Sequence, residues 1–221
     1  MQSASLKQEA PGLDSGVGSL SEARCSSRSG GGDARMLPWG HLAVGYLVYS
    51  LVIRLRHRQA PAGPAVLALA VGTQGPDLID KPLSWTFGIL PSGRSLGHSL
   101  LFAVLLGAVV WTLVKRYNRR PAAIAFVIGY LSHVIVDVLP AVRAGQWEIV
   151  GTLLWPVLPA YVYPGEQDRG IVEFLLALDF AALPLTGIVA TILAFGLWVY
   201  DGRPGVQTVL SALRKERPNN S

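Results

Sequence analysis

Long apolar runs alternate with short polar segments along most of the chain. The apolar runs occupy residues 37–55, 61–71, 98–114, 121–139 and 182–200. Most of them approach the roughly 20 helical residues that cross a bilayer, so we expect an all-α, multi-pass membrane protein with about five spans. Residues 143–163 are rich in Pro, Trp and Tyr, which is typical of an interfacial or re-entrant segment.

The two ends of the chain depart from this pattern. Residues 1–35 are rich in Ser, Gly and Ala, carry balanced charges and lack an apolar run. This composition predicts a disordered N-terminal tail and not a signal peptide, which needs an apolar core. We assign residues 36–200 to a helical membrane domain and residues 201–221 to a polar tail on the cytoplasmic side.

Composition supports a membrane protein. Apolar residues make up 51% of the 221 residues and charged residues only 15%, whereas soluble domains carry about 25% charged residues. The net charge of +5 does not indicate nucleic-acid binding, because the basic residues form short clusters between apolar runs, as in cytoplasmic membrane loops. The single cysteine, Cys25, excludes both a disulfide framework and a cysteine-based zinc site.

The basic clusters predict the topology. Residues 54–58 and 115–120 both carry several Arg or Lys and should face the cytoplasm. The chain must then cross the membrane twice between them, so the loop at residues 75–97 faces the opposite side. By the same reasoning, the start of the first span, the start of the third and the end of the fourth lie at the non-cytoplasmic end.

Six candidate metal ligands fall at that one depth: His41, Asp77, Asp80, His98, His133 and Asp137. Asp77 and Asp80 are three residues apart, and His133 and Asp137 are four apart, so each pair shares a helical face. Imidazole and carboxylate groups are ligands for zinc and also suit manganese. Ionisable groups are unfavourable inside a bilayer, and this favours a functional role.

Simpler roles remain open for each residue. His133 could form a hydrogen bond to Asp137 that bridges two helices. The pair Asp77 and Asp80 could simply start a helix, and His41 could be a lone interfacial histidine. Ser99 could cap a helix beside His98. Arg94 and Lys81 could anchor the chain at headgroups or bind an anionic substrate group. Glu173 and Asp179 are either exposed interfacial charges or additions to the site.

Four short motifs resemble a known family. They are WGHLAVG around His41, PDLID at residues 76–80, RSLGHS at residues 94–99 and GYLSHVIVD at residues 129–137. Together they resemble the membrane-bound metal-dependent hydrolases of bacteria and archaea over residues 36–160, and Leu-Trp-Pro at residues 154–156 is similar to an element after that family's last ligand pair. The resemblance implies distant kinship with zinc-dependent phospholipase C, a helical metal site and a phosphoester or lipid substrate.

The expected function is therefore metal-assisted hydrolysis at the membrane. Asp80 would be the general base, and Arg94 would hold an anionic oxygen of the substrate. A membrane metal-binding or transport protein is the alternative, but transport needs polar residues toward the cytoplasmic side. Residues 105–113 and 122–128 are almost wholly apolar there. A scaffold without metal would leave the shared depth of the six residues unexplained.

The topology can be tested by labelling with an impermeant thiol reagent. Single cysteines at Gly88 and Asn118, introduced in a Cys25→Ser background, should react from opposite sides of the membrane in intact cells and inverted vesicles. Equal labelling of both positions in intact cells would contradict the predicted arrangement.

Overall fold

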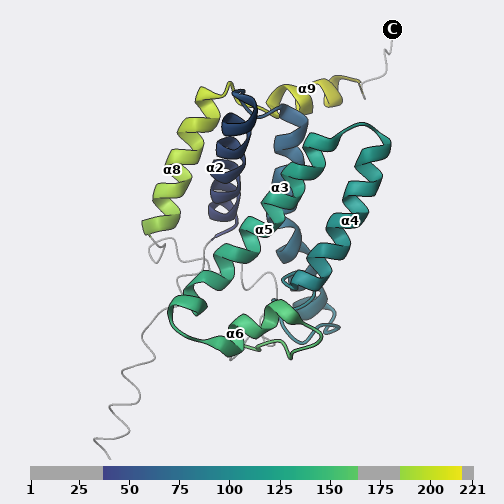
Figure 1. Ribbon diagram of the computed structural model, residues 1–221, viewed down its shortest axis with the longest axis vertical. Helices are drawn as coiled ribbons and strands as arrows, with labels where there is room; N and C mark the ends of the chain where they lie inside the picture. Colours follow the sequence, from purple (N-terminus) through teal and green to yellow (C-terminus); the bar gives the residue numbers. More distant parts are fainter. Residues whose placement is uncertain (1–36, 164–184, 216–221) are drawn as a thin grey trace, which may run out of the picture. The chain divides into compact units, whose positions relative to one another are not determined.

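The computed structural model describes residues 37–163 and 185–215, and these residues form helices and connecting segments without strands. Figure 1 shows the short helix α6 (Trp147–Gly151) at the end opposite α9 (Val206–Lys215). The elements are α2 (Pro38–His57), α3 (Gly63–Lys81), η1 (Pro82–Thr86), α4 (Leu100–Arg116), α5 (Arg120–Arg143), α6 (Trp147–Gly151), η2 (Thr152–Leu154), α8 (Leu185–Tyr200) and α9 (Val206–Lys215). The predicted disordered tail at residues 1–35, together with Glu173 and Asp179, lies outside the described residues.

The apolar runs correspond to α2, α3, α4, α5 and α8, but the second helix is longer than expected. Helix α3 continues through Pro76 to Lys81, and the π-helix η1 follows it directly. The connecting loop, expected from residue 75, therefore begins only after Thr86. Membrane-type helices tolerate an internal proline because neighbouring groups compensate for its missing N–H.

Helix α4 begins two residues after His98. The Ser99 hydroxyl accepts a hydrogen bond from the backbone N–H of Phe102 at 3.5 Å, so Ser99 is the N-cap of this helix. His98 itself belongs to the preceding loop.

Among the described helices, α5 is both long and apolar enough to cross a bilayer, and α8 is a shorter apolar helix. The similarly long α2 and α3 carry charged residues in their last turns. Helix α4 has no buried residue, and apolar side chains such as Val104 (72% exposed) and Leu105 (65% exposed) cover its outer face. An exposed apolar surface of this kind is typical of contact with lipid or with another protein.

The closest packing joins α3 to α5 and depends on glycine. A side chain at Gly129 would place its Cβ 2.6 Å from the Leu69 carbonyl oxygen, and one at Gly72 would collide with the Phe126 backbone. The backbones of α3 and α5 can therefore touch, as helices with small residues do in membranes. Helix α2 packs against α3, α5 and α8. The core between these helices contains small residues and tyrosines, namely Ala43, Tyr46, Tyr49, Ala65, Val66, Leu69, Ala125 and Ala194.

The segment that we assigned to a polar tail begins inside the fold. The Tyr46 hydroxyl donates a hydrogen bond to the fully buried Asp201 carboxylate at 2.6 Å, and Arg54 forms an ion pair with the same carboxylate. Asp201 therefore ties the end of α8 to α2. After a turn, residues of the expected tail form α9.

Gly129→Ala should lower the free energy of unfolding by about 1–3 kcal/mol, because the added methyl group overpacks the contact between α3 and α5. Gly196→Ala is the matched control, since a Cβ at this position in α8 meets nothing within 4 Å. Unfolding of the detergent-solubilised protein measures both. Equal destabilisation by the two substitutions would contradict a specific backbone contact at Gly129.

Candidate metal centre

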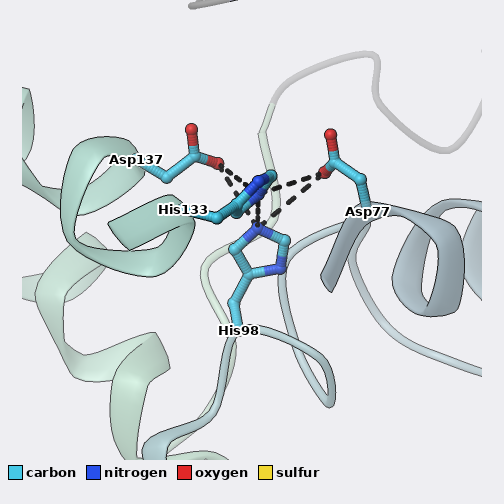
Figure 2. A group of neighbouring side chains, drawn as sticks. All are labelled: Asp77, His98, His133 and Asp137. Carbon is cyan, nitrogen blue, oxygen red and sulfur yellow. Dashed lines mark hydrogen bonds and ion pairs between the residues drawn. The ribbon is translucent and has the colours of Figure 1, made fainter. Parts of the chain in front are cut away.

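Four side chains from three segments converge at one end of the helices. Asp77 comes from the last part of α3, His98 from the loop before α4, and His133 and Asp137 from α5. One nitrogen or oxygen atom from each lies within 4.8 Å of the others, and Figure 2 shows the side chains pointing toward a common point. His98 and His133 are buried, while Asp77 and Asp137 are partly exposed. This group could hold a metal ion.

The spacing of the donor atoms fits a small divalent ion. His98 Nε2 and His133 Nε2 are 3.3 Å apart. Asp137 Oδ2 lies 3.3 Å from His98 Nε2, and Asp77 Oδ1 lies 3.8 Å from His133 Nε2. With bonds of roughly 2.0–2.2 Å, donors around a tetrahedral ion are about 3.3–3.6 Å apart. The two separations of 3.3 Å match this range. Asp77 Oδ1 lies 3.9 Å from His98 Nε2, Asp137 Oδ2 lies 3.9 Å from His133 Nε2, and no pair exceeds 4.8 Å, so the group is slightly wider than a tetrahedral site.

The other ring nitrogens of the two histidines fix their orientation. His133 Nδ1 donates to the Thr73 carbonyl oxygen at 2.6 Å, and His98 Nδ1 donates to the Asp80 carboxylate at 2.8 Å. With both Nδ1 atoms acting as donors, the two Nε2 atoms face each other, so either a proton or a metal ion must lie between them. Metal-binding histidines have the same arrangement, with the second nitrogen bonded to a carbonyl or carboxylate.

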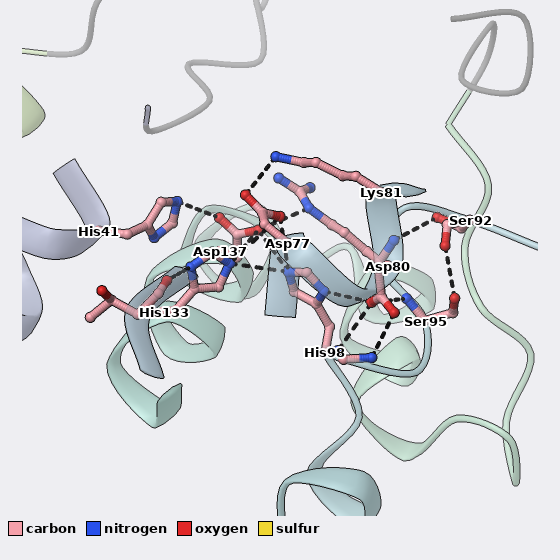
Figure 3. Close-up of polar contacts among 12 residues, drawn as sticks. His41, Asp77, Asp80, Lys81, Ser92, Ser95, His98, His133 and Asp137 are labelled. Atoms are coloured by element: carbon pink, nitrogen blue, oxygen red, sulfur yellow. Dashed lines mark hydrogen bonds and ion pairs between the residues drawn. The ribbon is translucent and has the colours of Figure 1, made fainter. Parts of the chain in front are cut away.

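Asp80 is not one of the four converging residues, but it holds His98 in place. Its carboxylate accepts hydrogen bonds from the backbone N–H groups of Ser95 (2.8 Å), Gly97 (2.7 Å) and His98 (3.2 Å), in addition to the bond from His98 Nδ1. The side chain is fully buried, and Figure 3 shows it surrounded by these partners. These four hydrogen bonds suit a role of Asp80 in orienting His98. The ligand and general-base roles that we expected for Asp80 stay predictions.

The loop that carries His98 fits closely against α3 and α5. Gly97 passes so near α3 that a Cβ would lie 2.6 Å from the Pro76 carbonyl oxygen. The Tyr130 hydroxyl of α5 donates a hydrogen bond to the Gly97 carbonyl oxygen. The Ser95 hydroxyl donates to the Ser92 carbonyl oxygen at 2.7 Å. These contacts hold His98 at a fixed distance from both helices.

His41 adjoins the four-residue group without being part of it. Its Nε2 lies 3.3 Å from Asp137 Oδ1, and its ring stacks on His133 with the centroids 4.0 Å apart. His41 is 2% exposed, and its Nδ1 has no hydrogen-bond partner in the described part of the chain. His41 therefore contacts one carboxylate oxygen of Asp137, while the other oxygen faces His98 and Arg94.

Each carboxylate of the group is paired with a cation. Lys81 Nζ lies 2.5 Å from Asp77 Oδ2, and Arg94 Nε lies 3.0 Å from Asp137 Oδ2. Arg94 also donates a hydrogen bond to the Tyr163 hydroxyl at 2.7 Å and lies over its ring. The two negative and two positive charges balance, so a bound divalent ion would make this part of the site positive.

The charges around the loop shift two pKa values. Burial lowers the pKa of His98, but hydrogen bonds to Asp137 and Asp80 raise it to about 9. Burial also lowers the pKa of Arg94, but Asp137 and the Tyr163 hydroxyl outweigh this effect and raise the pKa above its usual value. Arg94 therefore stays charged, and a metal that binds His98 must displace a proton.

A small cavity adjoins the group. Its volume is about 20 Å³, which is enough for roughly one water molecule. Arg94, His98 and Asp137 line one part of it, and Val134 and Leu153 line another. A water molecule or a small substrate group could therefore reach the donor atoms beside Arg94.

The four converging residues and their neighbours His41 and Asp80 were predicted from the sequence, but the residues that hold them in place were not. Thr73 acts through its backbone carbonyl, which no side-chain motif reveals. Tyr130 and Tyr163 were interpreted only as membrane-interface aromatics or left unassigned, although both contact the loop that holds His98. Gly97 was the feature of the sequence that could have predicted the close approach of this loop to the backbone of α3.

Comparison with known families identifies the group to which the chain belongs. The model of the YdjM inner membrane protein family matches residues 36–209, and the chain belongs to this family. Searches of curated proteins and of solved structures give no match. The family confirms the predicted membrane location. The hydrolase activity and the phospholipase C kinship implied by the sequence resemblance stay predictions.

Asp80→Asn should lower metal affinity about 10–100-fold, because it weakens the hydrogen bond that orients His98. His133→Ala should abolish binding, since it removes a donor. The exposed Glu148→Gln variant is the control for loss of one carboxylate charge. Zinc and manganese titrations of the purified, chelator-treated variants measure the effect. Wild-type affinity in Asp80→Asn would exclude this positioning role.

Proposed function

We propose that this member of the YdjM inner membrane protein family is a membrane-embedded, metal-dependent hydrolase. The observation that carries the proposal is the convergence of Asp77, His98, His133 and Asp137 at donor distances suited to a divalent ion. Zinc is the preferred ion and manganese the alternative, because the donors are imidazoles and carboxylates. When bound, the ion would lower the pKa of water and polarise the substrate.

The charges favour an anionic substrate. Lys81 and Arg94 already compensate Asp77 and Asp137, so a divalent ion leaves an excess of positive charge in the group. Arg94 also lines the cavity beside His98 and Asp137. A guanidinium group binds phosphate oxygens through several donors. A phosphoester, carried by a lipid or by a smaller molecule, therefore fits the site best.

The remaining polar residues would act as supports. Asp80 would fix the ring of His98, and the Thr73 carbonyl would fix the ring of His133. His41 would hold one oxygen of Asp137 and leave the other for the metal. Such outer hydrogen bonds pre-organise a metal site and tune its affinity.

The proposed topology has about five membrane spans, counting α2, α3 and α4 with the more apolar α5 and α8. The basic residues near the end of α2 and between α4 and α5 would face the cytoplasm. The metal centre would then face the non-cytoplasmic side, and the C-terminus would be cytoplasmic. The exposed apolar side chains of α4 support counting this helix as a membrane span.

The hydrolase is tested with phosphodiester and phospholipid analogues. Wild-type protein should turn over at least one of them, a chelator should abolish turnover, and added zinc or manganese should restore it. His133→Ala and Asp137→Ala should lose both metal and activity. Arg94→Gln should lower kcat by about 10²–10³-fold by removing a positioned donor, and metal analysis separates this effect from metal loss.

Glu148→Gln is again the control and should keep full activity, because its side chain is exposed and outside the group. Turnover that survives in His133→Ala or resists chelation would rule out the metal mechanism. Tight metal binding without turnover of any analogue would instead indicate a membrane metal-binding protein.

A further inference from the structure

A second cavity lies apart from the metal centre, between α2, α3, α8 and α9. Its volume is about 550 Å³, within the roughly 300–1,000 Å³ typical of ligand sites. Its walls are almost entirely apolar and include Leu42, Leu67, Phe195 and Leu210. Asp77, His98, His133 and Asp137 are not among its lining residues. We refer to it as the apolar groove.

Helix α9 lines one end of the groove and is packed tightly against α3. A Cβ on Gly63 would lie 2.6 Å from Thr208 Oγ1 and 3.0 Å from the Gly205 nitrogen. Gly205 has a φ of 99°, which a residue with a side chain rarely adopts. The two glycines thus allow α9 to cross the start of α3. Val206, Val209 and Leu210 contribute the apolar side of α9 to the groove.

An arginine lies beside this end of the groove. Arg203 directly precedes Pro204, which lines the groove. The backbone N–H of Arg203 donates a hydrogen bond to the carbonyl oxygen of Trp198, which also lines the groove. Its side chain is exposed, and it makes no ion pair within the described residues. Arg54 differs, because it is already neutralised by Asp201. Arg203 is therefore available to an anion outside the protein.

We propose that the apolar groove binds an acyl chain of an anionic phospholipid whose phosphate contacts Arg203. The protein belongs to an inner-membrane family, so phospholipid is the apolar molecule that surrounds it. An acyl chain matches the apolar walls, and an arginine beside the end lined by α9 matches a phosphate. This lipid site is independent of the metal centre and of the proposed hydrolysis.

Native mass spectrometry after reconstitution with phosphatidylglycerol and phosphatidylethanolamine tests the site. The wild-type protein should retain one phospholipid, with phosphatidylglycerol preferred. Ala70→Phe, which fills the groove from α3, should reduce retention about tenfold or more, equivalent to about 1.4 kcal/mol. Leu193→Phe is the matched control because Leu193 is 58% exposed on α8 and does not line the groove.

The headgroup is tested separately. Arg203→Asn keeps a residue that tolerates the positive φ of 59° at this position, and it should abolish the preference for phosphatidylglycerol while keeping the bound lipid. Arg116→Gln, at the exposed end of α4, should keep the preference. Unchanged retention in a folded Ala70→Phe, or wild-type protein that retains no lipid, would overturn the proposal.

A measurement on the wild-type protein covers the case in which Ala70→Phe does not fold. Phosphatidylglycerol with a diazirine in one acyl chain should crosslink mainly to groove residues such as Leu42, Leu67 and Phe195. Val104 and Leu105 report ordinary bilayer contact, because they are exposed on α4. Equal crosslinking of these two sets would show that the groove has no specific lipid and would reject the site.

Discussion

The metal centre depends on the backbone contact between α3 and α5. Gly129 allows α5 to lie against the Leu69 carbonyl, and one turn further along α3 the Thr73 carbonyl reaches Nδ1 of His133. The same approach brings Asp77 on α3 within a few ångströms of His133 and Asp137 on α5. A larger residue at Gly129 would separate the two helices and with them the donors. The glycine contact therefore positions the candidate metal centre as well as packing the two helices.

The ionisable groups of the site are arranged so that each charge has a partner. Asp77 is paired with Lys81, Asp137 with Arg94, and Asp80 with three backbone N–H groups and the ring of His98. Unpaired charges at this depth would be strongly unfavourable. This pairing explains how a mostly apolar protein can hold three carboxylates close together. It also explains why only some of them are free to face a ligand.

The two ends of the molecule have different chemistry. Helices α6 and α9 lie at opposite ends (Figure 1). Ile149 of α6 lines the small cavity beside the candidate metal centre, whereas α9 lines the apolar groove. Asp201 links the second end together by accepting a hydrogen bond from Tyr46 and an ion pair from Arg54. The groove and the candidate metal centre share α3 but use different residues of this helix, so substitutions can alter one without the other.

The sequence by itself determined the helical class and the membrane location, and it predicted six candidate ligands, four of which converge at the candidate metal centre. Apolar runs of bilayer length predict helices, and the four-residue spacing of His133 and Asp137 places both on one face of α5. Only the tertiary structure decided the separate roles of Asp77 and Asp80. Both lie on α3 near the same depth, but Asp80 turns into the loop and accepts its backbone N–H groups, whereas Asp77 faces His133. Only the tertiary structure likewise showed the contact of the Thr73 carbonyl with His133 and the presence of the apolar groove. Both arise from the packing of separate helices, so neither leaves a pattern in one segment of the sequence.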